Sequence, residues 1–301
     1  YQWLQNRHGA LIAASESNLS AHYEIHNVFK IAPSTFTRVT LQHGFECVGF
    51  LQNREHVKAH GENIRFGADI VGGWLPSGRL RSMAASERPK LMVTGPGLVL
   101  QTPKAGSRGI DEGLVCENLH SVRLNASGDF KASFMDVFFE FCSRLDEDGA
   151  RIALRPHPGG QYVLKNKVKL PANVSLANRP IYETDLRSYR YGVSAPSSVV
   201  IDMLLSGLPT AVWCDQDGVM DTSNYEGLTL ISTLQDWLAF RRDALKRPEM
   251  ILDRQRRFLA RLGMPVEAED VRNRFVGMME TASRRSGTPP PPAALSRATA
   301  S

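Results

Sequence analysis

The chain of 301 residues lacks the features that identify several common protein classes. Its four cysteines, Cys47, Cys116, Cys142 and Cys214, are far apart, and no two of them form a CxxC pair. Neither a zinc site nor a disulfide framework is therefore predicted, and reduced thiols of a cytoplasmic protein are expected. No apolar run approaches the ~20 residues that a membrane-spanning helix needs. The first residues do not resemble a signal peptide.

Several motifs that would identify a function are also missing. The sequence has no P-loop, no GxGxxG fingerprint and no HExxH motif, so an NTPase, a Rossmann dehydrogenase and a metalloprotease are not supported. His22 and His26 have the i, i+4 spacing of helical metal ligands, but without a supporting motif we predict no metal site and no tightly bound cofactor. No motif of RNA- or DNA-binding proteins occurs, so nucleic acid is not an expected partner.

The composition is that of a folded globular protein, with 42% hydrophobic and 22% charged residues and a net charge of +5. Basic residues are densest between Arg241 and Arg257, where acidic residues are interleaved with them. This pattern fits a solvated helix face, and it also fits contact with an anionic membrane surface or an acidic acceptor. We therefore expect a cytoplasmic protein, with peripheral association at the inner membrane as the alternative.

Apolar runs of strand length alternate with segments of helical periodicity, which predicts βαβ units and parallel sheets. Strands are expected at residues 10–14, 39–42, 68–71, 90–94, 152–154, 174–177 and 228–231. Helices are expected at residues 133–145, 183–189 and 234–281, the last range holding more than one helix. Residues 191–213 are expected to form a strand end, a Ser-Ser turn, an apolar helix that stops at Gly207-Leu208-Pro209, and a second strand.

The pattern breaks near residue 88, which predicts two facing Rossmann-like domains with a cleft between them. Residues 1–88 would form the acceptor-side domain, and residues 89–283 the nucleotide-binding domain. Because Tyr1 is not an initiator methionine, we expect the chain to belong to a longer protein and the first domain to be incomplete. Residues 284–301, which contain four consecutive prolines, are predicted to be a disordered tail or linker.

The most informative segment begins at Tyr191 with the end of a buried strand and continues through Ser197 and Ser198 into an apolar helix. A helix that begins at the carboxyl edge of a parallel sheet offers free N–H groups, hydroxyls and its dipole to a phosphate. An ordinary serine N-cap is the alternative interpretation. Asp202, one turn into the helix, is either a buried structural acid or an orienting residue.

A second polar corner, Arg155-Pro156-His157-Pro158, follows the predicted strand at 152–154. The two prolines restrict the backbone around His157, which suits an imidazole that holds a phosphate. Arg155 could form a bidentate contact with the same phosphate.

The third corner, Gln42-His43-Gly44, lies in the first domain, where Gly44 allows close approach to the backbone. Either His43 or Glu46 could be the general base. Thr94 and Gly95 begin a glycine turn that either donates N–H groups to a diphosphate or is only a turn.

Taken in order, Gln42-His43-Gly44, Arg155-Pro156-His157-Pro158 and the segment from Ser197-Ser198 to Gly207-Leu208-Pro209 resemble a family of bacterial envelope polymer transferases with the GT-B fold. The family includes CMP-Kdo and CMP-sialic acid transferases of capsule and lipopolysaccharide synthesis and the CDP-glycerol glycerophosphotransferases. The resemblance covers about residues 38–235, and the Ser-Ser segment is its most specific part.

The resemblance implies that His157, Ser197 and Ser198 hold the phosphate of a cytidine nucleotide, with the catalytic group on the first domain. The glycerophosphotransferases usually have Asp-Tyr before Ser-Ser and Trp-His-Gly at the first corner, whereas this chain has Ala195-Pro196 and Gln42-His43-Gly44. These departures favour the sugar transferases. We therefore expect a glycosyltransferase that moves a sugar from a CMP- or CDP-linked donor to a glycan or lipid-linked acceptor.

Three alternatives remain open at this point. The first is a glycerophosphotransferase-like enzyme. The second is a UDP-sugar epimerase, which would need paired carboxylates that the sequence does not clearly offer. The third is a non-catalytic nucleotide-binding domain of the same fold.

Overall fold

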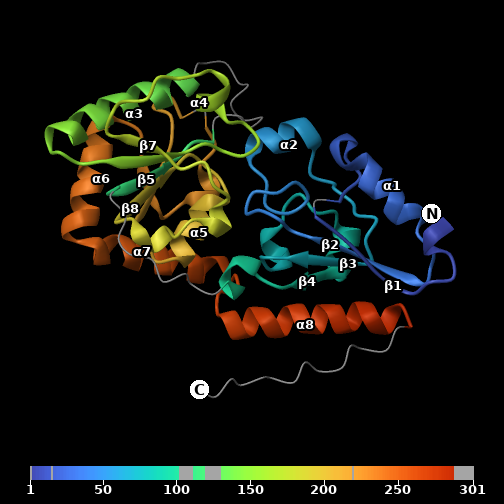
Figure 1. The fold of residues 1–301 in the computed structure, drawn as a ribbon. Coiled ribbons are helices and arrows are strands. Elements are labelled where there is room, and N and C mark those ends of the chain that lie inside the picture. The colour runs from blue at the N-terminus through green and yellow to red at the C-terminus, as the bar shows by residue number, and fades with distance from the viewer. Residues whose placement is uncertain (1, 15, 102–110, 119–129, 219, 288–301) are drawn as a thin grey trace, which may run out of the picture.

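The computed structural model describes residues 2–14, 16–101, 111–118, 130–218 and 220–287. These residues form two parallel β-sheets with helices packed on both faces, and the sheets lie side by side in two lobes (Figure 1). The predicted α/β architecture with two Rossmann-like domains is confirmed. Among the described residues, no helix has the combination of length and apolar character that crossing a membrane requires.

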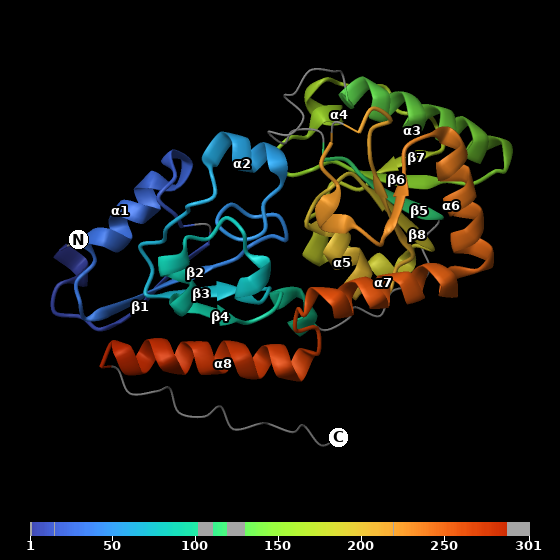
Figure 2. The same ribbon diagram turned by 180° about the vertical axis from the view of Figure 1, so that it is seen from behind.

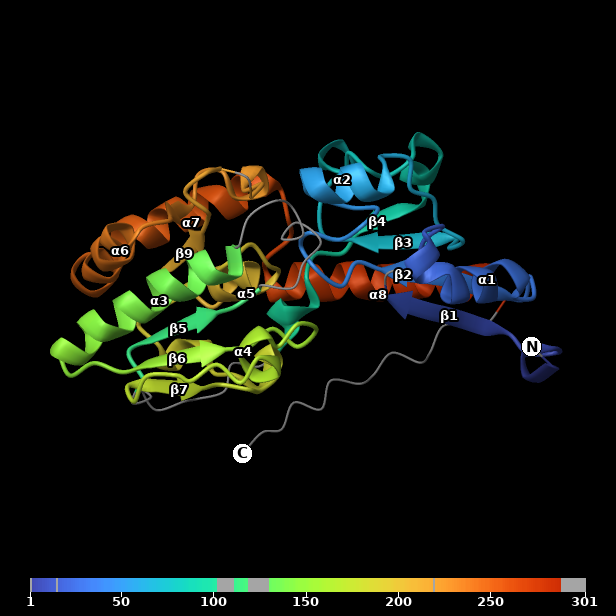
Figure 3. The ribbon, with the colours of Figure 1, turned by 90° about the horizontal axis from the view of Figure 1, so that it is seen from above.

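The first lobe is built on four parallel strands in the order β1–β2–β3–β4. The strands are β1 (Gly9–Ala14), β2 (Phe36–Leu41), β3 (Ile70–Gly73) and β4 (Leu91–Val93). Two helices, α1 (Tyr23–Ile31) and α2 (Arg54–His60), follow β1 and β2 in the chain. One face of this sheet is covered by α8 (Ala268–Arg285), whose Met278 packs against Val39 and Ile70 of the sheet (Figures 1 and 3).

The second lobe contains six parallel strands in the order β10–β9–β8–β5–β6–β7. The strands are β5 (Gly113–Cys116), β6 (Ile152–Arg155), β7 (Val174–Leu176), β8 (Tyr191–Ser194), β9 (Thr210–Trp213) and β10 (Thr229–Ile231). β5 lies between β6 and β8 and pairs with both in register, so the loops that leave these three strands emerge next to one another. The sequence analysis missed β5, because its four-residue apolar run is too short to separate from a loop by periodicity.

Five helices belong to the second lobe: α3 (Phe130–Glu147), α4 (Tyr162–Lys165), α5 (Val199–Leu205), α6 (Leu234–Lys246) and α7 (Pro248–Leu262). α3 and α6 cover one face, where Phe134 and Trp237 pack with Trp213 of the sheet. α5 covers the other face, where Val199 and Met203 pack with Leu114. The helix expected at residues 183–189 is instead two 3-10 turns, Ile181–Glu183 and Leu186–Ser188.

The expected division at residue 88 differs from the topology in two ways. β4, which was assigned to the start of the second domain, pairs in parallel with β3 and completes the first sheet. The end of the chain also returns to the first lobe: α7 leads back from the second lobe, and α8 packs on the first sheet (Figure 2). The reason is tertiary, since an apolar strand carries no local signal for which of two parallel sheets it joins. The predicted tail begins too early, because α8 continues to Arg285, and residues 288–301 lie outside the described part of the chain.

One buried apolar cluster contains residues of both lobes. Phe45 and Leu75 of the first lobe belong to the same buried cluster as Val200, Ile201 and Leu204 of α5. Phe45 has no exposed surface, and its ring centroid lies 5.6 Å from that of Tyr225 in the second lobe. Burial of this kind stabilises the pair of lobes as one unit and fixes the loop after β2 against α5.

Candidate functional site

The candidate site lies at the carboxyl edge of the second sheet, where β5, β6 and β8 end. The chain passes from β5 to β6 and β7 on one side and to β8, β9 and β10 on the other. This reversal makes a topological switch point, where open α/β sheets bind their ligands. The loops that follow β5, β6 and β8 leave the sheet there next to one another.

The loop between β8 and α5, which contains Ser197 and Ser198, is the corner predicted to bind a phosphate. Ser197 is buried, with 9% of its surface exposed, and its Oγ accepts the Val199 N–H at 3.5 Å. Among the described residues, no backbone carbonyl accepts the N–H of Ser197 or Ser198. α5 has only seven residues, so its dipole contributes less than the sequence analysis expected. An anion placed at this loop would therefore be attracted mainly by these two N–H groups and the Ser197 hydroxyl.

His157 lies on the adjacent loop, half-buried between Pro156 and the exposed Pro158. Its Nδ1 accepts the backbone N–H of Gly159 at 3.1 Å. In the neutral imidazole the proton must then be on Nε2, which makes that nitrogen the hydrogen-bond donor of the ring. The local hydrogen bond thus orients the ring and selects the tautomer that can donate to a phosphate oxygen.

Arg155 has partners other than the predicted phosphate. The residue is buried, with 5% exposed, and its Nε donates to the carbonyl of Arg179 at 3.3 Å. A bidentate contact that uses Nε would have to break this bond. Burial raises the pKa of Asp202 to about 7, and the charge of Arg155 opposes this rise. Asp202 and Arg155 thus interact beneath the edge, which favours the structural interpretation of Asp202.

The first lobe contacts the Ser-Ser loop directly. The Phe45 N–H donates to Ser198 Oγ at 2.8 Å. Gly44 lies so close that a Cβ atom added there would be 2.6 Å from the same oxygen. The structure thus brings the Ser-Ser corner and the Gln42-His43-Gly44 corner together. As predicted, Gly44 allows this close approach because it has no side chain. The contact also means that the Ser198 hydroxyl is already in use as an acceptor.

The two candidate bases have different surroundings. Glu46 Oε1 accepts from Nδ2 of Asn224 in the second lobe at 2.8 Å, so this carboxylate connects the lobes. His43 is partly exposed, and its Nδ1 lies 3.3 Å from Cys47 Sγ. Partial desolvation lowers the pKa of His43, and the nearby His22 lowers it further. A neutral, accessible imidazole is the better proton acceptor of the two.

Thr94 and Gly95 do not join the nucleotide-side corners as predicted. They follow β4 in the first lobe, where Thr94 Oγ1 donates to the Gly73 carbonyl at 3.2 Å. Gly95 has a φ of +77°, and a Cβ there would be 2.7 Å from the Pro265 carbonyl. The turn therefore packs against the segment that leads into α8.

Four buried polar residues at the carboxyl edges of the two sheets were not predicted: Glu117 and Asn118 in the second lobe, and Glu16 and Ser17 in the first. Glu117 and Asn118 follow β5, and both are buried. In the first lobe, His26 contacts Glu16, and Ser17 Oγ lies 2.6 Å from His22 Nδ1. For Glu117 and Asn118 the sequence did offer a signal, a polar pair directly after a short apolar run (Leu-Val-Cys-Glu-Asn). His22 and His26 therefore have separate partners.

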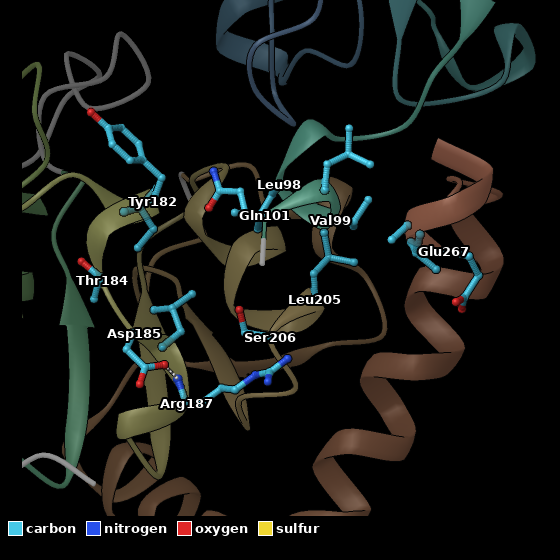
Figure 4. Close-up of a pocket in the computed structure, with 15 residues that line it drawn as sticks. Leu98, Val99, Gln101, Tyr182, Thr184, Asp185, Arg187, Leu205, Ser206 and Glu267 are labelled. Carbon is cyan, nitrogen blue, oxygen red and sulfur yellow. Dashed lines mark hydrogen bonds between the residues drawn. The ribbon is translucent and has the colours of Figure 1, made fainter. Parts of the chain in front are cut away.

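A pocket of about 810 Å³ opens elsewhere, on the side where the two lobes are connected (Figure 4). Its walls include the 3-10 turn at Gly97–Leu100, residues 181–187, Ser206 at the end of α5, and the start of α8. Among the described residues that line it there is no predicted site residue. Because the polar corners lie at the other end of α5, the pocket is separate from the candidate site.

The contact between Gly44 and Ser198 leads to a testable prediction about stability. Gly44→Ala should force the Ser198 hydroxyl to rotate away from the Phe45 N–H, which costs about 1–3 kcal/mol for the buried donor left unpaired. In a Ser198→Ala background the nearest atom is Ser198 Cβ at 3.7 Å, an ordinary contact, so Gly44→Ala should then cost little more. Urea denaturation of the four proteins measures this coupling. Simple additivity of the two substitutions would contradict the arrangement.

No protein-family model matches the chain, and no curated protein matches its sequence. Solved structures match in fold. A Listeria monocytogenes protein assigned as a UDP-N-acetylglucosamine 2-epimerase is 12% identical, with a TM-score of 0.57 over 93% of this chain and 75% of that one. The S. aureus MnaA–UDP co-structure is 11% identical, with a TM-score of 0.55 over 93% and 76%. CalG4, the calicheamicin glycosyltransferase, is 12% identical, with a TM-score of 0.48 over 94% and 74%.

At this identity the first two likenesses show the fold alone, because one fold carries many functions. They agree with the topology described above: two parallel-sheet α/β domains of the GT-B type, as the sequence predicts.

Proposed function

We propose that the chain binds a nucleotide-activated sugar at the carboxyl edge of its second sheet and transfers the sugar to a glycan or lipid-linked acceptor. The observation that carries this proposal is that the His157 loop and the Ser-Ser loop leave the same edge of the sheet on either side of β5, at the topological switch point. An oriented imidazole donor and two backbone N–H groups that no described carbonyl accepts suit the phosphate of such a donor.

The reaction would proceed as follows. His43 takes the proton of an acceptor hydroxyl, and the oxygen forms a bond to the anomeric carbon of the sugar. The bond from that carbon to the phosphate oxygen breaks, and its electron pair stays on the nucleotide. The N–H groups of Ser197 and Ser198 and the Nε2–H of His157 stabilise the charge on this leaving phosphate. The lowered pKa of His43 keeps its imidazole neutral near pH 7, as a base requires.

The finer part of the proposal is a cytidine nucleotide, CMP- or CDP-linked, and an envelope or capsular polysaccharide as the product. It rests on the resemblance of the His-Pro and Ser-Ser corners to the envelope polymer transferases. We place this activity in the cytoplasm. Association with the inner membrane is weakened as a proposal, because the basic residues of α7 have acidic neighbours: Arg256 and Arg257 both pair with Asp253.

Isothermal titration calorimetry with CMP, CDP, UMP, UDP and GDP tests the proposal. Binding of a cytidine nucleotide at least tenfold tighter than its uridine counterpart is expected. Tighter binding of UDP would support the nucleotide-sugar site but contradict the proposal of a cytidine-linked donor. Absence of binding by all five would reject the proposal.

A UDP-sugar 2-epimerase is the second candidate, and one observation favours it. Burial raises the pKa of Glu117 to about 7, so a carboxyl next to the His157 loop can exchange a proton near neutral pH. Incubation with UDP-N-acetylglucosamine in D₂O discriminates between the two candidates. Deuterium at C2 of the recovered sugar would identify the epimerase, and an unlabelled sugar would leave the transferase.

A further inference from the structure

β5 pairs with both β6, which leads into the His157 loop, and β8, which leads into the Ser-Ser loop. Its ladder extends beyond the strand itself on each side: the Glu117 N–H donates to the Arg155 carbonyl at 3.0 Å, and the Ala195 N–H donates to the Cys116 carbonyl at 3.4 Å. The two residues that follow β5 are therefore held between the His157 loop and the Ser-Ser loop. Both side chains are buried, Glu117 with 1% and Asn118 with 6% of its surface exposed.

The Glu117 side chain extends toward the His157 loop. Its Oε2 accepts the Val163 N–H at 3.3 Å. The backbone N–H groups of Tyr162 and His157 also interact with the carboxyl and lower its pKa. One buried carboxylate thus contacts the loop at both ends, at His157 and at the start of α4.

The Asn118 side chain extends the other way. Its Nδ2 donates to the carbonyl of Pro196, the residue directly before Ser197. A buried hydrogen bond at this carbonyl fixes the peptide plane whose N–H belongs to Ser197. The orientation of that donor, which the proposed function assigns to the phosphate, therefore depends on Asn118.

We propose that Glu117 and Asn118 are positioning residues that hold the His157 loop and the Ser-Ser loop in a fixed relation on either side of β5, without touching the nucleotide. The expected effect of these residues on nucleotide affinity rests on the proposed function. The geometric part, that the two side chains order these loops, is independent of it.

The charge of Glu117 makes the arrangement sensitive to pH. Burial raises the pKa of the carboxyl to about 7, against the opposing effect of the three backbone N–H groups. Protonation below pH 7 removes the charge-assisted part of these hydrogen bonds. The titratable and charged neighbours of Glu117 are Cys116, whose thiol pKa burial raises to about 12, Arg155 at the end of β6, and His157 on the adjacent loop.

Glu117→Gln is the informative variant, because the amide keeps the shape and cannot titrate. Glu87→Gln is a matched control: Glu87 is also buried and accepts a backbone N–H, that of Phe66 at 3.2 Å, but it lies in the first lobe. CMP affinity is measured by calorimetry at pH 6 and pH 8 for the wild type, both variants and His157→Gln. Amide NMR of Tyr162 and Val163 is recorded over the same pH range without nucleotide.

At pH 8 Glu117→Gln should bind CMP about tenfold more weakly than the wild type, which corresponds to a fall of one unit in the pKa of Glu117 on binding. At pH 6 the difference should shrink to about twofold, because the wild-type carboxyl is then protonated as well. Comparison with the wild type removes the titration of CMP itself. His157→Gln should retain the Glu117-dependent step in the amide shifts, and Glu87→Gln should match the wild type throughout.

The amide signals of Tyr162 and Val163 should shift with a midpoint near pH 7 in the wild type and not in Glu117→Gln. Unshifted amides in the wild type would overturn the positioning role. Equal CMP affinity of Glu117→Gln and wild type at pH 8 would also overturn the positioning role. So would a CMP affinity that rises from pH 6 to pH 8 in the variant but not in the wild type. If the amides titrate as expected while CMP does not bind the wild type, the loop-ordering role stands and the proposed CMP site is rejected.

Discussion

Combined replacement of His157 and Ser197 by alanine is expected to weaken nucleotide binding by roughly 10²–10⁴-fold. Each hydrogen bond to a charged phosphate contributes about 1.5–3 kcal/mol, and the double variant removes two of them. The prediction follows from the tautomer of His157, whose Nδ1 accepts the Gly159 N–H and leaves Nε2–H as the donor. Calorimetry with the tightest-binding nucleotide of the panel measures the effect.

The fold of this double variant should remain close to that of the wild type. Both side chains lie on edge loops, and the apolar residues beneath them are unchanged. Ser206→Ala is the control for loss of a hydroxyl, because Ser206 lies at the other end of α5 and lines the separate pocket of Figure 4. If Ser206→Ala loses binding and the double variant does not, the nucleotide binds in that pocket and the candidate site is wrong.

The second large effect is expected from Phe45→Ala. This side chain is fully buried, and its ring centroid lies 5.6 Å from Tyr225 and 6.4 Å from Phe258, both in the second lobe. Removal of a buried phenylalanine typically costs 3–5 kcal/mol through lost apolar burial and the cavity that remains. Because this cavity would lie where the cores of the two lobes join, the lobes should also lose their coupling.

Urea unfolding followed by tryptophan fluorescence and by far-UV circular dichroism measures both consequences. The wild type should unfold in one transition by both probes, and Phe45→Ala in two. Phe50→Ala is the matched control: Phe50 is equally buried, but its aromatic partner is Phe66, within the first lobe. A single, equally shifted transition in both variants would mean that the lobes do not depend on Phe45 for their contact.

Much of the fold follows from local patterns in the sequence. Short apolar runs alternate with helical periodicity, and this alternation suffices for parallel sheets in two lobes. It also places polar residues at the carboxyl ends of strands, which is why Arg155, His157, Ser197 and His43 can be grouped from the sequence alone. The four-residue β5 escaped detection, and with it Glu117 and Asn118, because four residues hold too little periodicity.

Other features depend on contacts between distant parts of the chain, for which a sequence pattern carries no signal. An apolar strand such as β4 is compatible with either sheet, and only packing assigns it to the first. Arg155 has the same local pattern whether its guanidinium is exposed or buried; its burial beside Asp202 is a result of how β6 and α5 pack. Likewise, the Ser198 hydroxyl accepts a hydrogen bond from Phe45, 153 residues away in the chain. Periodicity and turn chemistry act over a few residues, whereas the partners of buried polar groups are chosen when whole sheets and helices come together.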